Sequence, residues 1–348
     1  MYTGDYDKAL QTADSYITLA PDEPNPYDTK AEILVNMGEI DQAISTYQKV
    51  ISLRPDFINF SAAFSLGLLQ VYKQQYTEAR NTFQNIAIKG KRYNRSLART
   101  FMAEIPYYRG KFNEAAEILA DGIIADKMEL ATAGKYGARS YKHYIRSMIF
   151  AEQNLYDSAY IEMELAIETH NKAFPRSQPA FRCMYVQLLC DGGNLEKAEK
   201  IYKEIEADYL GGIELAVSAN WYALGSLAFA RGNSEEAVEY FEKSVAAFPS
   251  YDFKMMLARA YMETNRYEQA IETYEQLLSN YVTPWRLHLG IWSVKANYHL
   301  GLAYEATGRF ETAAKYYSQF IDIWKDADEG IEEIDDARER LRRLENKS

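Results

Sequence analysis

The stretch WYALGSLAFARGNSEEAVEYFEKSVAAFP, from Trp221 to Pro249, decides the fold of this chain. In it, Gly232 precedes Ala237 by five residues, and this pairing of a turn residue with an alanine occurs nine times along the sequence. Successive alanines lie 33 to 44 residues apart, about the length of a helix, a turn and a second helix. Units that repeat in this way bury a core only against their neighbours, so the sequence predicts a stacked array. The nine alanines are Ala9, Ala43, Ala79, Ala115, Ala159, Ala198, Ala237, Ala270 and Ala313.

Each conserved spacing within the unit has a local physical cause. The turn residue, usually glycine or asparagine, can adopt the positive φ that ends a first helix, and the polar residues after it can cap a second one. The alanine must be small where two helices cross, and a bulky residue four positions later, such as Phe241, fills the space between units. We expect second helices to begin near Asp5, Asp41, Thr77, Asn113, Asp157, Glu196, Ser234, Glu268 and Glu311.

This pattern resembles the tetratricopeptide repeat family over nearly the whole chain. The family's order of Trp, Leu-Gly, Gly, Ala, Phe and Pro is matched by Trp221, Leu224, Gly225, Gly232, Ala237, Phe241 and Pro249. The resemblance implies an all-α, right-handed superhelical solenoid of stacked helix-turn-helix repeats. The part from Tyr298 to Asp328 is also similar to repeat arrays attached to bacterial serine/threonine kinases and winged-helix regulators, which implies a bacterial signalling context.

We expect one continuous array over residues 1–326, with an incomplete first repeat, about eight full repeats and a capping helix over residues 328–346. Acids early and arginines late in that last segment suit the helix dipole. Two irregularities stand out. Pro106 lies inside a predicted first helix and predicts a kink. The 44 residues between Ala115 and Ala159 predict a longer or additional helical stretch between about Ile118 and Tyr141.

Composition and charge exclude several classes of function. The formal net charge of −11 argues against a nucleic-acid partner, because phosphate binding needs clustered positive charge. Neither a bilayer-spanning apolar stretch nor a secretory signal at Met1 is present, which favours a cytoplasmic location without membrane insertion. Cys183 and Cys190 lie seven residues apart on one predicted helix, too far for a disulfide, so we expect free thiols and no metal site.

The resemblance implies that the first helices line a concave groove, and aromatic and methionine side chains gather at the positions that would face it. Such residues are typical of binding surfaces, although each tyrosine alone is equally consistent with packing between units. The predicted groove residues are Phe64, Leu68, Tyr72, Tyr107, Tyr108, Tyr141, Tyr144, Met148, Tyr222, Phe229, Met255 and Tyr298.

Acids outnumber bases at the same positions. Glu104, Glu152, Asp191 and Glu263 form the predicted electrostatic rim, and Arg259 and Lys295 are the cations among the groove-facing positions. One column of the groove contains no lysine, arginine or asparagine, so the clamp that some family members use for chaperone tails is absent. The groove therefore favours an apolar or basic peptide, or an amphipathic helix.

Nothing in the sequence points to catalysis or to a cofactor. The histidines His143, His170, His288 and His299 are scattered, and no hydrolase, metalloprotease or nucleotide-binding motif occurs. Trp292, in the long interval before Ala313, is interpreted as packing at a junction between units. The sequence predicts a non-enzymatic protein-interaction scaffold. The alternatives are a ligand-sensing regulatory arm of a multidomain signalling protein, or an assembly or transport adaptor, and the oligomeric state stays open.

Overall fold

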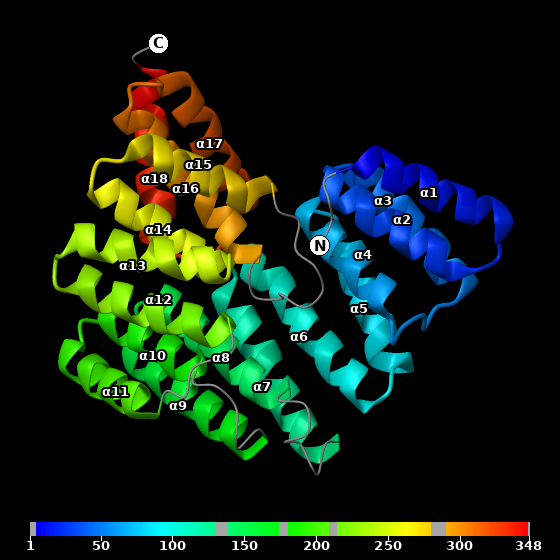
Figure 1. Ribbon diagram of the computed structural model, residues 1–348, viewed down its shortest axis with the longest axis horizontal. Helices are drawn as coiled ribbons and strands as arrows, with labels where there is room; N and C mark the ends of the chain where they lie inside the picture. Colours follow the sequence, from blue (N-terminus) through cyan, green and yellow to red (C-terminus); the bar gives the residue numbers. More distant parts are fainter. Residues whose placement is uncertain (1–4, 130–137, 174–179, 209–213, 280–289, 347–348) are drawn as a thin grey trace. The chain divides into compact units, whose positions relative to one another are not determined.

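The computed structural model describes residues 5–129, 138–173, 180–208, 214–279 and 290–346. Every element of regular structure within these ranges is an α-helix (Figure 1). The chain divides into two compact units, residues 1–108 with 279–290 and residues 109–278 with 291–348, and each is described by itself. The all-α solenoid of paired helices is thereby confirmed.

The first unit contains three pairs of neighbouring helices. Its helices are α1 (Tyr6–Leu19), α2 (Pro24–Met37), α3 (Ile40–Leu53), α4 (Ser61–Tyr72), α5 (Tyr76–Lys89) and α6 (Arg92–Tyr108).

The second unit holds the rest of the array and its capping helix. Its helices are α7 (Phe112–Glu129), α8 (Ala138–Glu152), α9 (Tyr156–Ala173), α10 (Ala180–Asp191), α11 (Leu195–Asp208), α12 (Glu214–Ala230), α13 (Ser234–Ala247), α14 (Tyr251–Glu263), α15 (Tyr267–Ser279), α16 (Gly290–Ala306), α17 (Phe310–Ile323) and α18 (Glu332–Glu345).

The turn residues set where the second helices begin. All nine second helices begin within one residue of the predicted position. The eight turn residues that the structure describes have positive φ, because this backbone conformation ends the first helix and lets the chain reverse. They are Gly38, Gln74, Gly110, Asn154, Gly193, Gly232, Asn265 and Gly308.

Close approach of first and second helices explains the small residues of the pattern. A Cβ on Gly67 would lie 2.3 Å from the ring of Phe83, and one on Gly301 would lie 2.3 Å from the ring of Tyr317. Both rings are fully buried. Each glycine therefore provides the space that the aromatic residue of the following helix fills.

Two irregular regions follow their sequence signals to different extents. Helix α6 continues through Pro106 to Tyr108. Helix α7 runs for 18 residues to Glu129, so it provides part of the predicted lengthening, and the rest of that stretch lies outside the described residues. The capping helix α18 begins at Glu332, because Gly330 has a φ of +83° that a helix cannot contain. Continuity of the array over residues 1–326 stays a prediction.

The second unit closes on itself. We call residues 324–330, which join α17 to α18, the closing segment. The guanidinium of Arg109 pairs with Asp326 at 2.7 Å, and the backbone N–H of Asp328 donates to the carbonyl of Gly110 at 3.0 Å. The ring of Trp324 lies edge-on to Phe112, with centroids 5.7 Å apart. The end of the array is thus joined to its first helix, and the inner helices surround a cavity.

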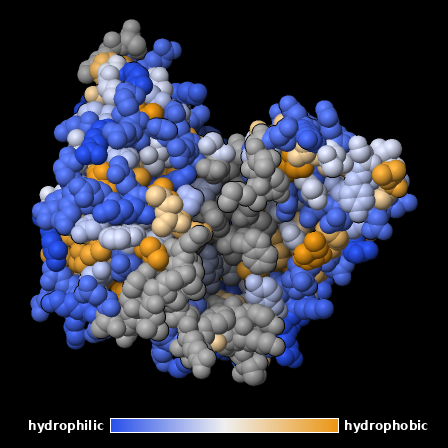
Figure 2. Space-filling model, in the orientation of Figure 1, coloured by the Kyte–Doolittle hydropathy of each residue, from blue (hydrophilic) through white to orange (hydrophobic). Residues whose placement is uncertain are grey.

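The surface visible in Figure 2 is mostly hydrophilic, and its apolar side chains form small separate patches. Scattered apolar residues of this kind are normal on folded proteins. The search for a functional site therefore turns to the cavity of the second unit.

Candidate functional site

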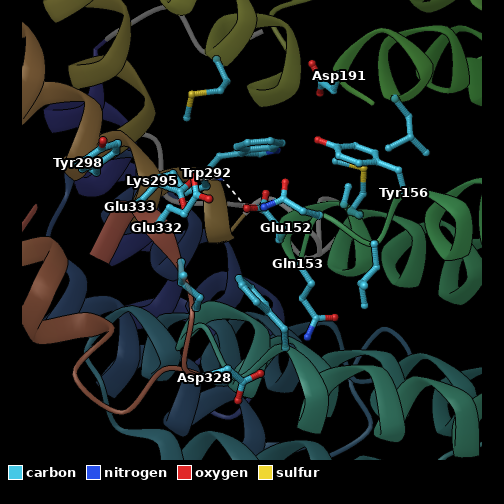
Figure 3. A pocket seen from close by; sticks show the side chains of 18 of the residues that line it. Glu152, Gln153, Tyr156, Asp191, Trp292, Lys295, Tyr298, Asp328, Glu332 and Glu333 are labelled. Atoms are coloured by element: carbon cyan, nitrogen blue, oxygen red, sulfur yellow. Dashed lines mark hydrogen bonds and ion pairs between the residues drawn. The ribbon is translucent and has the colours of Figure 1, made fainter. Parts of the chain in front are cut away.

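A cavity of about 830 Å³ lies inside the second unit. The inner helices α8, α10, α12, α14, α16 and α18 each contribute side chains, as do the closing segment and the N-terminus of α7. Figure 3 shows Tyr156 and Asp191 on one side, Lys295 and Glu333 on the opposite side, and the ring of Trp292 between them. The cavity combines aromatic walls with many charged groups.

The lining is strongly acidic. Only two of the lining residues, Arg259 and Lys295, carry a permanent positive charge. Charges that face a recessed space are screened less than surface charges, so the excess of carboxylates gives the cavity a negative potential. The lining carboxylates are Glu152, Asp191, Asp328, Glu329, Glu332, Glu333 and Asp336.

Lys295 is held between two carboxylates. Its Nζ lies 2.6 Å from Glu152 of α8 and 2.9 Å from Glu333 of α18. Burial lowers the pKa of Lys295, but these two carboxylates outweigh burial and raise it above its usual value. For Glu333 burial raises the pKa and Lys295 lowers it by more, so the net shift is downward. For Glu152 burial dominates and its pKa is raised. Lys295 is therefore charged and already neutralised by the protein.

Arg259 and Asp191 have a different environment. The guanidinium of Arg259 contacts the sulfur of Met256 at 3.3 Å and lies over the ring of Phe229. No carboxylate of the described residues lies within 4.0 Å of it. Asp191, the last residue of α10, accepts a hydrogen bond from Gln187 and is exposed to solvent. Burial raises the pKa of Asp191, and the charge of Arg259 opposes that shift.

Aromatic residues of the cavity are oriented by hydrogen bonds. The indole N–H of Trp292 donates to Asp252 at 2.7 Å, and the hydroxyl of Tyr298 donates to Asp336 at 2.8 Å. His299 stacks on the ring of Tyr274 with an interplanar angle of 7°. Burial and the nearby cations lower the pKa of His299 to about 3, so it is neutral at pH 7. The aromatic walls are thus held in fixed positions, as a binding site requires.

The arrangement is suited to binding. In the described parts of the chain, no group of three or more His, Cys, Asp or Glu side chains is placed to hold a metal ion. The buried thiol of Cys183 has a pKa raised to about 12, because burial disfavours the thiolate, so it is an unreactive thiol at pH 7. Carboxylates, aromatic rings and a cation around an enclosed space can recognise charge and shape.

The structure brings six of the predicted site residues together in the cavity. They come from four of the inner helices and from one capping contact with α18. Their role in binding stays a prediction. The six are Met148, Tyr222, Met255, Tyr298, Glu152 and Asp191.

The other predicted residues lie elsewhere. Several are buried in contacts between helices, as when Phe64 packs on Phe101 at 4.8 Å and Tyr144 packs on Phe181 at 5.3 Å. In the first unit, Tyr72 is partly accessible and lies edge-on to Tyr108. The remaining residues are the buried Leu68, Glu104 and Tyr107, the partly accessible Tyr141 and Phe229, and the exposed Glu263.

Sequence reasoning missed part of the cavity. Trp292 was assigned to a junction between units, yet it lines the cavity. Glu332 and Glu333 belong to the capping helix, and Asp328 belongs to the closing segment, so none of them occupies a repeat position. Only the closure of the second unit brings these residues to the site, and repeat spacing carries no signal for it.

A helical-repeat array with an enclosed cavity is the class of protein that this fold and site define. Two models described as tetratricopeptide repeat match the chain, one over residues 183–252, 222–283 and 255–328, and the other over residues 25–57. Together they cover about half of the sequence. The chain belongs to the tetratricopeptide repeat family.

Similar proteins carry the same family name. Tetratricopeptide repeat protein 13 of Homo sapiens is 28% identical over 134 residues, which are 38% of this chain and 15% of that protein. A tetratricopeptide repeat protein from Parabacteroides merdae has 13% identity, coverage of 92% and 98%, and a TM-score of 0.42. The APC/C hetero-tetramer Cut9-Hcn1 has 14% identity, coverage of 99% and 60%, and a TM-score of 0.41. None of the helices in the described ranges is long and apolar enough to cross a membrane.

Proposed function

We propose that this chain is a non-enzymatic scaffold that binds a protein partner, and that the cavity of the second unit receives a basic segment of that partner. Tetratricopeptide repeats generally mediate protein–protein interaction and are typically not catalytic. The acidic lining of the cavity is the observation that carries the finer proposal.

The carboxylates of the cavity exceed what the protein itself neutralises. Lys295 is matched by Glu152 and Glu333, which leaves Glu329 and Glu332 exposed at the cavity with no printed ion pair. Repulsion between carboxylates in a recessed space is relieved when a cationic side chain enters. The aromatic residues Trp292 and Tyr156 add contact area for the aliphatic part of such a side chain.

Charge reversal tests this proposal. Peptides of about twelve residues, rich either in Lys and Leu or in Glu and Leu, would be titrated with the chain by fluorescence anisotropy. We expect the basic peptide to bind, and the double variant Glu329→Lys, Glu332→Lys to bind it about tenfold or more weakly, with a smaller dependence on salt.

A matched control is available on the neighbouring helix. Glu311 is also an exposed acid in the first turn of its helix, α17, and it does not line the cavity. Glu311→Lys imposes the same cost at a helix N-terminus as Glu332→Lys and should leave binding unchanged. Equal binding by the double variant and the wild type would reject the cavity as the site for basic segments.

The size of the cavity favours the alternative function, a ligand-sensing arm. A volume of about 830 Å³ falls within the range of roughly 300–1,000 Å³ that is typical of small-molecule sites. A regulatory arm of a bacterial signalling protein would use such a cavity for a metabolite.

A further inference from the structure

The two cations of the cavity differ in how the protein neutralises them. Lys295 has carboxylate oxygens at 2.6 and 2.9 Å. The contacts of Arg259 are a methionine sulfur at 3.3 Å and an aromatic ring 5.7 Å away, and none of these is an anion. Arg259 is therefore a cavity-lining guanidinium without an ion-pair partner among the described residues.

An unpaired guanidinium in a recessed site is unfavourable by itself. Partial burial removes water from the charge, and no carboxylate of the described residues replaces that water within 4.0 Å. The guanidinium remains charged, and its planar fork of donors matches the two oxygens of a carboxylate. The geometry leaves this position open to an anionic group from outside the chain.

Asp191 provides the opposite charge in the same part of the cavity. Arg259 lies on α14 and Asp191 ends α10, and α12, which packs against both helices, places Tyr222 in the lining between them. Each charge shifts the pKa of the other, which shows that they are near, yet no ion pair joins them at 4.0 Å or less. A ligand with both charges can contact both groups.

We propose that this cavity binds a small zwitterion, an α-amino acid, with its carboxylate on Arg259 and its ammonium group on Asp191. Met255, Tyr222 and Trp292 form the apolar and aromatic walls that would receive its side chain. Figure 3 shows the ring of Trp292 near the centre of the cavity, on the side toward Asp191. This inference goes beyond the proposed peptide binding, because it assigns a second class of ligand to the cavity.

Blocked ligands test the inference without altering the protein. Each of the twenty common α-amino acids would be added to the full chain at millimolar concentration, and binding would be read by thermal shift and by isothermal titration calorimetry. For the tightest binder we expect the methyl ester and the N-acetyl derivative each to bind at least about tenfold more weakly, because each removes one charge. Equal binding of all three forms, or binding of none of the twenty, would overturn the proposal.

Two variants assign each charge to its residue. In Arg259→Gln the free acid and its methyl ester should bind equally, and in Asp191→Asn the free amine and its N-acetyl form should bind equally. Arg231→Gln is the matched control, since Arg231 also ends an inner helix region but pairs with Glu199 and does not line the cavity. Its affinity for the amino acid should equal that of the wild type.

The outcomes separate this inference from the proposed function. If a variant loses its helical circular dichroism signal, the comparison of blocked ligands on the wild type decides the question alone. Binding of the basic peptide without binding of any amino acid rejects the zwitterion site and keeps the scaffold. Binding of an amino acid without binding of the peptide does the reverse. Retained preference for the free acid in Arg259→Gln would also reject the assignment.

Discussion

The backbone N–H of Asn113 donates a hydrogen bond of 2.9 Å to the carboxylate of Asp328, which lies 215 residues further along the chain. Asn113 is the second residue of α7, so Asp328 satisfies one of the free N–H groups at the start of that helix. A side chain of the closing segment thus caps the first helix of the second unit, and the cap depends on the whole array being in place.

Gly110 is the most sensitive position of the closure. Its φ is +72°, and a Cβ there would lie 2.8 Å from Ala327 and 3.1 Å from the ring of Trp324. We expect Gly110→Ala to lower the free energy of unfolding of the second unit by about 2–4 kcal/mol, because backbone strain adds to a steric clash. Urea denaturation followed by circular dichroism would measure the change.

Gly193 offers the matched control for that substitution. It has a similar φ of +74°, but a Cβ there would meet no atom within 4 Å. Gly193→Ala should therefore show only the backbone strain, about 1 kcal/mol. Equal losses in the two variants would mean that contact with the closing segment does not limit Gly110.

Lys142 and Asp126 form a fully buried ion pair between α8 and α7, with Nζ and Oδ2 2.7 Å apart and both side chains 0% exposed. Lys142→Met should cost about 3–5 kcal/mol, because it leaves a carboxylate buried without its partner. The double variant Lys142→Met, Asp126→Leu should recover most of that loss. A single variant as stable as the wild type in urea would show that the pair is not coupled.

Asp28 of the first unit should make stability depend on pH. Burial, and then the charge of Glu32, raise its pKa to about 6 from 3.8. Between these values the folded state binds the proton more readily than the unfolded state, so this group stabilises the fold less as the pH rises through 6. Asp28→Asn should raise stability at pH 7 by about 1–3 kcal/mol and have little effect at pH 4.

The neighbour Glu32 provides the comparison for Asp28. Its side chain is exposed, and its charge is the smaller of the two causes. Glu32→Gln should therefore produce a much smaller gain at pH 7 in the same urea experiment. A larger gain than that of Asp28→Asn would assign the pH dependence to repulsion instead of burial.

His299 should act in the opposite direction. Burial, Lys295 and Arg259 lower its pKa to about 3, so the unfolded state binds the proton first as the pH falls below about 6.5. Its contribution is present above pH 6.5 and declines toward pH 3, by about 2 kcal/mol at pH 5. His299→Phe, which can keep the stacking on Tyr274, should remove this loss. Urea midpoints at pH 7 and pH 5 that fall equally in both proteins would contradict the prediction.

The helices were predictable because each boundary has a local cause. Gly232 with its positive φ ends α12, and Ser234 begins α13, all within three residues of sequence. Contacts across a helix pair, such as Gly225 against Phe241, also repeat at a constant spacing. Sequence periodicity reports such short-range causes directly.

The site was predictable only in part. Met148, Tyr222 and Met255 were found because their positions on the inner helices repeat. Glu333 was missed because it reaches the cavity through a contact between distant parts of the chain. Burial of Phe64 in a ring contact was open for a related reason, since spacing places a residue on a face but does not say what covers it.

The closing segment also has a consequence for how the second unit folds. In a linear array almost every contact joins residues that are near in sequence, so formation can begin anywhere and spread. Here the pairing of Arg109 with Asp326 requires a loop of about 217 residues to close, and that entropy loss is repaid only after the intervening helices have stacked. Formation of the cavity is therefore the final event of folding, and local loosening anywhere around the circle reopens it first at this seam.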